Sequence, residues 1–231
     1  MKPTQTLSAA DGHCLQVIYR EPPNVDARGG LVLIQEIFGL TPQLEALAMR
    51  FAARGYRVVV PALYDRLKPG KALQYDQVEE ARKLVSQLQL EEVMLDIAAA
   101  GELARCEQGV AVAGYCWGGG IAYLAACELD IDCAVSFYGT RLPAYLGEEP
   151  QCPIQFHFGE QDQHIPLVDV EKVRIANPGQ ELHIYGEAGH AFANDARPSF
   201  HPPSAELAEH RMFRFIDDCW KRGNARNNRI L

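Results

Sequence analysis

The sequence predicts an α/β fold with a mainly parallel central sheet and helices on both faces. Three observations support this prediction. Short apolar runs rich in β-branched residues alternate along the chain with longer segments that favour helix. The connections between them are short. Several runs are continuously apolar, as expected of strands that are covered on both faces. Strands and helices that alternate in this way are typical of a parallel sheet between helical layers.

Length and composition favour a single domain spanning residues 1–231. A chain of 231 residues with 48% apolar residues can fill one hydrophobic core, and it contains no internal repeat or low-complexity linker. The net charge of −8 argues against nucleic acid and anionic membranes as partners. No signal-like or membrane-spanning stretch is evident, so we expect a cytoplasmic protein. No exposed apolar stripe stands out, which leaves a monomer as the default.

The first half of the chain is expected to begin with a strand at Cys14–Arg20. The apolar run at Leu31–Ile34 predicts a buried strand. Thr41 and Pro42 then supply an N-cap and a first-turn proline for a helix to about Arg54, which Gly55 closes. The last elements of this half are a strand at 58–60, and one or two helices up to about residue 105 that start at a capping-box variant, Asp76-x-x-Glu79.

The second half continues the alternation of strands and helices. Gly109–Ala113 predicts a strand, and Ile121–Glu128 predicts the helix that follows it. Two further strands end at glycine, where a loop can leave the edge of the sheet. The remaining predicted strands are 133–139, 153–159 and 181–185, and the remaining helices are 167–176 and 204–221.

A glycine-dense turn at residues 114–120, Gly-Tyr-Cys-Trp-Gly-Gly-Gly, joins a predicted strand to a predicted helix. This is the G-x-nucleophile-x-G elbow of α/β-hydrolases, with Cys116 in the position of serine. The glycines are needed because the turn is sharp and forces the nucleophile into an unfavourable backbone conformation. The sulfur of Cys116 is then exposed at a helix N-terminus, which favours the thiolate.

Residues that follow predicted strands are the candidates for the site, because ligands of open α/β sheets bind at the carboxyl ends of strands. Hydrolases of this architecture carry nucleophile, acid and base in that chain order, and Cys116, Asp162 and His190 satisfy it. Glu160 and Asp169 are alternatives to Asp162 as the acid, but only Asp162 lies in a Gly-x-x-Asp segment after a strand. The candidates at strand ends are Glu36, Tyr64, Cys116, Tyr138, Asp162 and His190.

The chemistry explains these residue types. A thiol with a reference pKa of about 8.5 is mostly protonated at neutral pH, so an adjacent imidazole must accept its proton. A carboxylate on the other ring nitrogen fixes the tautomer and stabilises the imidazolium. Backbone N–H groups of Trp117 and Ile37 are expected to hold the oxyanion. A serine nucleophile at Ser136 or Ser86 is a weaker alternative, since neither serine has flanking glycines.

Four blocks together resemble the dienelactone hydrolase family, in the right order and over nearly the whole chain. They are Gln-Glu-Ile-Phe-Gly at 35–39, Gly-Tyr-Cys-Trp-Gly-Gly at 114–119, Gly-x-x-Asp at 159–162 and Gly-His-x-Phe at 189–192. The resemblance implies a triad of Cys116, Asp162 and His190. It also implies that Glu36 contacts the resting thiol and takes part in its activation.

The chain departs from the family pattern where the resemblance implies two arginines that hold a substrate carboxylate. These positions are occupied by Val78 and Asn194. Arg82 lies one helical turn from Val78 and is a candidate for a repositioned anion contact. Five aromatic residues are candidates for the wall of the pocket, with core packing as the equal alternative: Phe38, Tyr64, Trp117, Tyr138 and Phe192.

The remaining cysteines and histidines are expected to be structural. Seven cysteines without a C-x-x-C pair indicate neither a disulfide framework nor zinc, and we expect no metal and no cofactor. Cysteines other than Cys116 are interpreted as core thiols: Cys14, Cys106, Cys127, Cys133, Cys152 and Cys219. Histidines other than His190 are interpreted as surface or hydrogen-bonded residues: His13, His157, His164, His183, His201 and His210.

The function predicted from these residues is hydrolysis of a small ester or lactone, in the manner of a carboxymethylenebutenolidase, through an acyl-cysteine intermediate. The alternative is a non-catalytic or weakly active α/β-hydrolase scaffold that binds a small molecule and carries a reactive sensor thiol, since a fold does not determine a function. An enzyme would show turnover of an activated ester, whereas a sensor would show alkylation of Cys116 without turnover.

Overall fold

The computed structural model describes residues 5–23 and 25–227, and these divide between two compact units, Met1–Val112 and Ala113–Leu231. The strand β5 (Val110–Tyr115) begins in the first unit and ends in the second. The assignment of residues 1–231 to one domain stays a prediction.

The first unit is built on four strands in the order β1-β2-β4-β3. Of these, β3 and β4 are parallel, with Leu31 opposite Val58, whereas β2 pairs antiparallel with both β1 and β4. Every residue of β3 is buried, as its continuous apolar run predicts. The four strands are β1 (Gln5–Ser8), β2 (Cys14–Arg20), β3 (Gly30–Ile34) and β4 (Arg57–Pro61).

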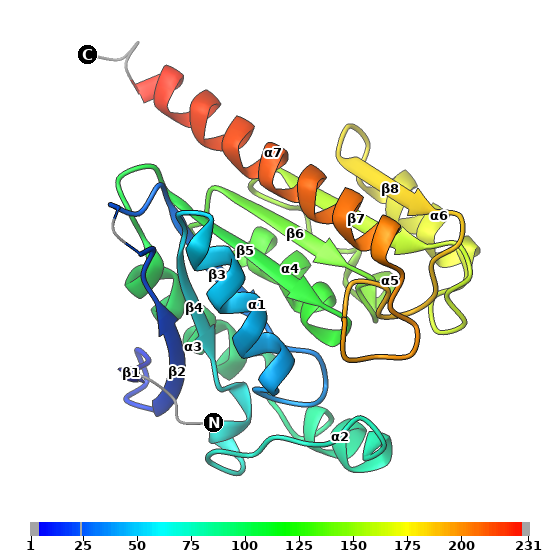
Figure 1. The fold of residues 1–231 in the computed structure, drawn as a ribbon, viewed down its shortest axis with the longest axis horizontal. Coiled ribbons are helices and arrows are strands. Elements are labelled where there is room, and N and C mark those ends of the chain that lie inside the picture. The colour runs from blue at the N-terminus through cyan, green and yellow to red at the C-terminus, as the bar shows by residue number, and fades with distance from the viewer. Residues whose placement is uncertain (1–4, 24, 228–231) are drawn as a thin grey trace. The chain divides into compact units, whose positions relative to one another are not determined.

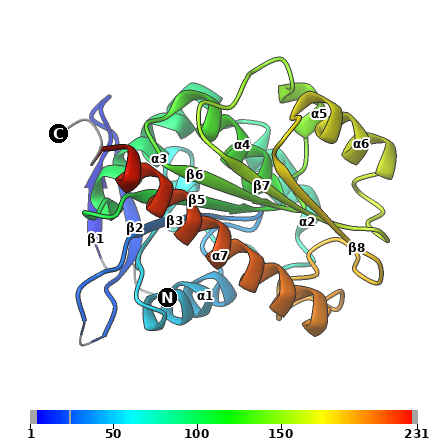
Figure 2. The ribbon, with the colours of Figure 1, turned by 90° about the horizontal axis from the view of Figure 1, so that it is seen from above.

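Two helices cover opposite faces of these strands, α1 (Pro42–Ala53) and α3 (Leu90–Ala104) (Figures 1 and 2). The predicted start of α1 is confirmed, because the Oγ1 atom of Thr41 accepts the backbone N–H of Leu44 at 3.3 Å. Gly55 has a φ of 97°, which is the left-handed conformation that ends a helix. The unit also contains a 3₁₀ turn, η1 (Leu63–Arg66), and the helix α2 (Val78–Val85).

The predicted capping box at Asp76 is wrong. The helix α2 begins at Val78, and its N-cap is Gln77, whose side chain makes no capping hydrogen bond. Instead, the Oε1 atom of Gln77 accepts the backbone N–H of Gln74 at 2.9 Å, which closes a turn before the helix. The elements β1 and η1 were not predicted, because four residues carry too little periodicity to indicate a strand or a turn of helix.

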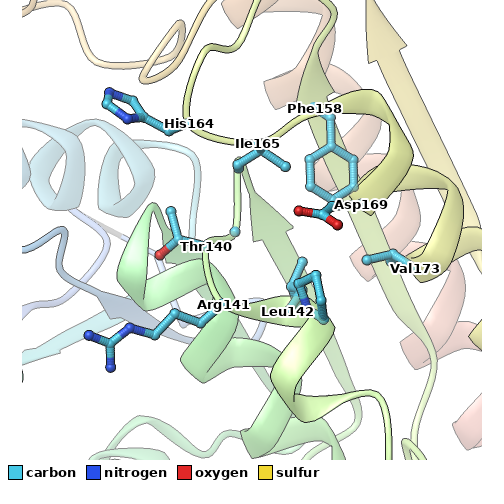
Figure 3. A pocket seen from close by; sticks show the side chains of 10 residues that line it. Thr140, Arg141, Leu142, Phe158, His164, Ile165, Asp169 and Val173 are labelled. Carbon is cyan, nitrogen blue, oxygen red and sulfur yellow. The ribbon is translucent and has the colours of Figure 1, made fainter.

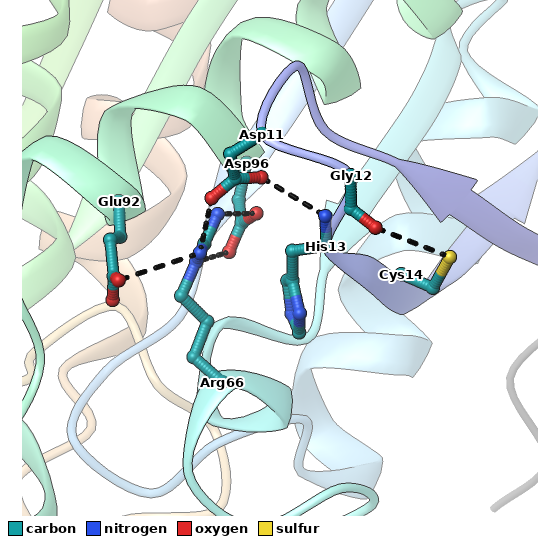
Figure 4. Close-up of polar contacts among 7 residues, drawn as sticks. All are labelled: Asp11, Gly12, His13, Cys14, Arg66, Glu92 and Asp96. Carbon is teal, nitrogen blue, oxygen red and sulfur yellow. Dashed lines mark hydrogen bonds and ion pairs between the residues drawn. The ribbon is translucent and has the colours of Figure 1, made fainter.

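Arg66 links three segments of the first unit (Figure 4). Its guanidinium donates to both carboxylate oxygens of Asp96 on α3, at 2.9 and 2.7 Å, and to Asp11 in the β1–β2 turn at 2.7 Å. The side chain of Asp96 is completely buried, and that of Arg66 is 6% exposed. Burial raises the pKa of the Asp96 carboxyl, and Arg66 opposes that rise only in part. The bidentate pair is therefore needed to keep a buried charge inside the unit.

The second unit contains three parallel strands, β6 (Cys133–Phe137), β7 (Ile154–Gly159) and β8 (Glu181–Tyr185). The helix α4 (Trp117–Glu128) covers one face of these strands, and α7 (Pro202–Asn227) covers the opposite face (Figures 1 and 2). The other helices are α5 (Leu142–Tyr145) and α6 (Leu167–Ala176). The predicted mainly parallel α/β fold with helices on both faces is confirmed.

His157 lies in the core of the second unit, as a histidine whose hydrogen bonds are satisfied. Its Nε2 and Nδ1 atoms lie 2.8 Å from the side chains of Gln155 and Tyr185, and its ring stacks on Phe137 at 4.5 Å. Burial lowers its pKa well below the usual value, so the ring is neutral. The backbone carbonyl of His157 accepts the N–H of Tyr138 at 2.7 Å, which fixes the end of β6.

No helix within residues 5–23 and 25–227 is long and apolar enough to cross a membrane.

Candidate active site

Cys116 occupies a strained turn between β5 and α4, as the glycine pattern predicts. Its backbone has φ 55° and ψ −117°, a conformation that is unfavourable for a residue with a Cβ atom. Three backbone hydrogen bonds hold it there. The N–H of Cys116 donates to Phe137 O, and its carbonyl accepts the N–H groups of Gly119 and Thr140, each at 3.0 Å. The turn is thus tied both to α4 and to the end of β6.

The glycines of the elbow have the predicted steric role. A Cβ atom at Gly114 would lie 1.8 Å from the carbonyl oxygen of Gly118, and one at Gly119 would lie 2.7 Å from the Cα atom of Gly139. Both contacts are with backbone atoms, which cannot rotate away. The strand and the helix can approach this closely only because these positions lack side chains.

The structure brings Cys116, His190 and Asp162 together through two contacts. The Nε2 atom of His190 lies 3.2 Å from the Sγ atom of Cys116, and its Nδ1 atom lies 2.7 Å from Oδ2 of Asp162. The second carboxylate oxygen of Asp162 accepts the backbone N–H of His164 at 2.7 Å and that of Ile165 at 3.2 Å. Asp162 is therefore locked in one orientation, and it fixes the orientation of the imidazole ring in turn.

The environment of His190 makes its ring a strong proton acceptor. Burial lowers the pKa of His190, but the hydrogen bonds to Asp162 and Cys116 outweigh this effect and raise the pKa to about 10. The side chain of Asp162 is 1% exposed and that of His190 is 14% exposed, so solvent screens their interaction little. A thiol proton can therefore pass to the Nε2 atom of this ring.

Aromatic rings surround His190 in the second unit. Tyr138, which has a φ of 38°, lies edge-on to the imidazole with ring centroids 5.3 Å apart. Phe192 packs against Tyr138 at 5.4 Å and is completely buried. Tyr138 therefore lies beside the candidate base, and Phe192 packs against Tyr138.

His164 is a neighbour of the site that the sequence analysis missed. Its ring meets the ring of His190 edge-to-face, with centroids 4.8 Å apart, and the side chain is otherwise exposed. It had been interpreted as a surface or hydrogen-bonded residue. The signal that could have found it is its position two residues after Asp162, in the turn whose N–H groups hold that carboxylate.

The other side chains predicted at the site belong to the first unit, and their placement at the thiol stays a prediction. The Tyr64 hydroxyl donates to the backbone carbonyl of Ile37, and its ring is buried. Phe38 packs edge-on against Tyr75 at 4.9 Å. These contacts favour a packing role for both rings. Glu36 is half-buried in the loop after β3.

Arg82 is exposed on α2, where its guanidinium pairs with Glu79 at 3.2 Å. An exposed pair within one helix of this kind contributes little to binding or stability. The structure of the first unit therefore adds no support for Arg82 as an anion contact.

The alternatives to the triad gain no support. Glu160 is exposed, and Asp169 pairs with Lys172 at 2.7 Å on α6. Ser136 is completely buried within β6, and the Ser86 hydroxyl donates to the carbonyl of Lys83 at the end of α2.

The interpretation of Cys14 as a core thiol is wrong, because it is exposed at the start of β2, where strand alternation turns Leu15 inward instead. All seven cysteines are free thiols. Cys133 and Cys219 are buried, as expected of core thiols, whereas Cys106, Cys127 and Cys152 are half-buried.

A parallel α/β architecture with a strained thiol elbow, followed in chain order by an acid and a base, defines an α/β-hydrolase. The family model of the dienelactone hydrolase family matches residues 15–219. The chain belongs to the dienelactone hydrolase family.

The sequences and structures of known proteins agree with membership of the dienelactone hydrolase family. The carboxymethylenebutenolidase of Pseudomonas putida is 33% identical over 223 residues, which cover 91% of this chain and 94% of that protein. That of Pseudomonas sp. strain P51 is 33% identical over 202 residues, with 82% and 84% covered. Among solved structures, the "Putative Dienelactone Hydrolase" of Klebsiella pneumoniae superposes with a TM-score of 0.80 at 27% identity, covering 92% of this chain and 97% of that one.

Membership and these relatives establish the chain as a hydrolase of carboxylic esters or lactones. They favour the predicted enzyme over the alternative of a non-catalytic scaffold. A small-molecule ester or lactone is accordingly its class of substrate.

Proposed function

We propose that the protein cleaves a small ester or lactone through an acyl-cysteine intermediate, with Cys116 as nucleophile, His190 as base and Asp162 as the acid that orients it. The observation that carries the proposal is the continuous contact from the thiol to the imidazole at 3.2 Å and from the imidazole to the carboxylate at 2.7 Å. A nucleophile, a base and a group that orients the base are the parts needed for covalent hydrolysis.

In the first step the Cys116 sulfur forms a bond to the substrate carbonyl carbon, and its proton passes to Nε2 of His190. The C–O bond of the ester or lactone then breaks, and His190 returns the proton to the leaving oxygen. In the second step His190 takes a proton from water, the resulting hydroxide attacks the thioester carbon, and the C–S bond breaks. The thiol is regenerated by the same ring.

The developing oxyanion needs hydrogen-bond donors fixed in place before the reaction. Trp117 is the first residue of α4, so its backbone N–H has no acceptor within the helix and suits this role. The backbone N–H of Ile37 is proposed as the second donor. Glu36 is proposed as an additional acceptor of the thiol proton when substrate arrives. Both assignments follow the family resemblance of the 35–39 block.

The protein acts as a cytoplasmic monomer without a cofactor or metal. Tyr138 and Phe192 contribute to the pocket wall near His190, because the ring of Tyr138 packs against the base and the ring of Phe192 packs against Tyr138.

Replacement of the nucleophile tests the proposal. Cys116→Ala should lower the turnover of an activated aryl ester by about a thousandfold or more, because acylation needs the sulfur. Its thermal unfolding should stay cooperative, since a smaller side chain fits the same turn. Cys14→Ala, which removes an exposed thiol of the first unit, is the matched control and should retain full turnover. Wild-type turnover in folded Cys116→Ala would contradict the mechanism.

A further inference from the structure

We propose that His157 is a positioning residue, which keeps the turn at Cys116 and the loop at His190 in the geometry that the reaction needs. This inference rests on the proposed function, because it concerns the alignment of the proposed nucleophile with its base. His157 lies on β7, in the middle of the second unit, and it acts through its neighbours on β6 and β8.

His157 faces the helix α7. The next residue of β7, Phe158, lines a hollow between the loop after β6 and the helix α6 (Figure 3). Successive side chains of a strand point to opposite faces of the sheet, so the His157 ring lies on the other face. That face is covered by α7, which carries Arg211. His157 is therefore a residue of the core and not of this hollow.

A continuous chain of hydrogen bonds runs through the His157 ring, from a cation to an anion. Arg211 forms a hydrogen bond with the Tyr185 hydroxyl, which lies 2.8 Å from Nδ1 of His157. The Nε2 atom of His157 lies 2.8 Å from Oε1 of Gln155. The Gln155 amide then donates to Oε2 of Glu181 at 2.7 Å. The chain thus connects α7 to the two neighbouring strands β7 and β8.

The donors and acceptors of this chain fix one tautomer of His157. A guanidinium can only donate, so the Tyr185 hydroxyl accepts from Arg211 and gives its own proton to Nδ1 of His157. A neutral imidazole whose Nδ1 is an acceptor carries its proton on Nε2, and this proton is donated to Gln155. Burial lowers the pKa of His157 well below its usual value, which agrees with a neutral ring. The ring is therefore held in one orientation and one protonation state.

Toward β6, His157 supports the backbone of the proposed nucleophile. His157 lies opposite Phe137 in the parallel register, and the two rings stack with centroids 4.5 Å apart. The carbonyl of Phe137 accepts the N–H of Cys116 at 3.0 Å. The carbonyl of His157 accepts the N–H of Tyr138, whose ring lies against His190. Cys116 and Tyr138 both have positive φ, so the surrounding structure must keep their strained backbone from relaxing.

Toward β8, the same chain supports the loop that carries His190. The ring of Tyr185 packs against Phe192 with centroids 5.0 Å apart. The carbonyl of Tyr185 accepts the N–H of Ala188 at 3.2 Å. Ala188 lies two residues before His190 and Phe192 two residues after it, so Tyr185 contacts the loop on both sides of the base.

The two sets of contacts act on one distance, the 3.2 Å between Nε2 of His190 and Sγ of Cys116. These two residues lie 74 positions apart in the chain, so the strands that carry them must set this distance. A misplacement of about 1 Å can lower a rate by about a hundredfold. A His157 ring that is fixed between β6 and β8 therefore keeps the thiol aligned with its base.

Removal of the Tyr185 hydroxyl tests the positioning role of His157. Tyr185→Phe keeps the ring that packs against Phe192 and removes the donor to Nδ1 of His157. We expect kcat for an activated aryl ester to fall roughly tenfold at unchanged KM, because alignment is lost while substrate binding is not. Tyr123→Phe is the matched control, since it removes the hydroxyl of another buried ring of this unit, which donates to the carbonyl of Glu148 at 2.8 Å. It should keep the wild-type kcat. Circular dichroism at the assay temperature checks that all three proteins are folded.

Nuclear magnetic resonance of protein labelled with ¹⁵N-histidine measures the geometry directly. The wild-type His157 ring should show a proton on Nε2 and none on Nδ1. The proton between Nδ1 of His190 and Oδ2 of Asp162, which lie 2.7 Å apart, should give a signal that shifts in Tyr185→Phe and stays in place in Tyr123→Phe. A loss of stability alone would leave this signal of the folded protein where it is.

The outcomes separate this inference from the proposed function. If the wild-type protein hydrolyses the ester and Tyr185→Phe keeps its kcat, or if His157 carries its proton on Nδ1, the positioning role is wrong while the proposed function stands. An equal fall of kcat in Tyr123→Phe would assign the effect to stability and would also overturn the positioning role. If the folded wild-type protein hydrolyses no activated ester, the proposed function is contradicted, and this inference with it.

Discussion

At the scale of residues, the proposed chemistry depends on how Asp162 and Cys116 change the pKa of His190. Burial of the ring lowers the pKa of His190, yet its two hydrogen-bond partners raise that pKa to about 10. The pKa of His190 in the folded state is therefore above its ordinary value of 6.5. Because folding raises the pKa of His190, the charged ring stabilises the folded state. This contribution to the free energy of unfolding is fully present below about pH 6.5, and it is lost as the pH rises through about 10.

Asp162→Asn should remove most of this effect, because an amide cannot supply the negative charge that holds the imidazolium. We expect kcat/KM for an aryl ester to fall by roughly a hundredfold to ten-thousandfold. Urea unfolding between about pH 6.5 and 10 should show a shallower loss of stability with rising pH than in the wild-type protein. Asp218→Asn, an exposed change on α7, is the control for both measurements. Unchanged activity in folded Asp162→Asn would contradict the role of Asp162.

The residues of the proposed triad could be selected from the sequence because each is marked by a local pattern. Cys116 has flanking glycines, Asp162 follows a strand, and His190 lies in a glycine loop before the last helix. His164 was not found. Its relevance lies in a ring contact with His190, which leaves no pattern in the sequence.

At the scale of elements, the strand–turn–helix from β5 to α4 positions Cys116, the proposed nucleophile. Its geometry requires the absence of a Cβ atom at Gly114, where the carbonyl oxygen of Gly118 would lie 1.8 Å away. The strain at Cys116 can persist only because the backbone hydrogen bonds to Phe137, Gly119 and Thr140 hold the turn.

Gly114→Ala should therefore destabilise the protein by about 2 kcal/mol or more, since the added methyl group meets backbone atoms and the strand and helix must separate. Gly101→Ala is the matched control. Gly101 lies within α3, and a Cβ atom there meets nothing within 4 Å, so alanine should raise stability by about 0.5–1 kcal/mol. Urea unfolding measures both. Equal midpoints for the two variants would contradict the steric account of the elbow.

Elements of five residues or more with a clear apolar pattern were predicted well, and the four-residue elements were not. The predicted bounds of β2, α6 and β8 match the structure, as does the capped start of α1. The four-residue elements β1, η1 and α5 were missed because one turn or two strand repeats do not establish a period. The start of α2 was misplaced because Gln77 closes a local turn that competes with the predicted cap.

At the scale of the whole molecule, burial of charge makes the first unit depend on one ion-pair network. Arg66 connects η1 to α3 and to the β1–β2 turn (Figure 4). No sequence pattern indicated this network, because Arg66 and Asp96 are 30 residues apart and charged side chains usually face water. The substrate was equally unpredictable, since it depends on a pocket formed by distant segments.

Arg66→Met should destabilise the protein by about 3 kcal/mol or more at neutral pH, because it leaves the buried Asp96 carboxylate without a partner. The loss should shrink in acid, where Asp96 takes up a proton, since burial raises the pKa of that carboxyl. The double variant Arg66→Met/Asp96→Leu should recover much of the loss. Thermal unfolding of the wild-type protein, Arg66→Met and the double variant measures these changes in stability. A double variant that is no more stable than Arg66→Met would contradict the account of the buried pair.

The central claim is that the acyl group is carried by the Cys116 sulfur. The direct measurement is rapid acid quenching of the enzyme during turnover of an activated aryl ester, followed by peptide mapping by mass spectrometry. We expect the acyl group on the peptide that contains Cys116, at a level that matches the initial burst of released phenol. Turnover with the acyl group on a serine or on another cysteine, or with a burst but no acylated Cys116, would contradict the account.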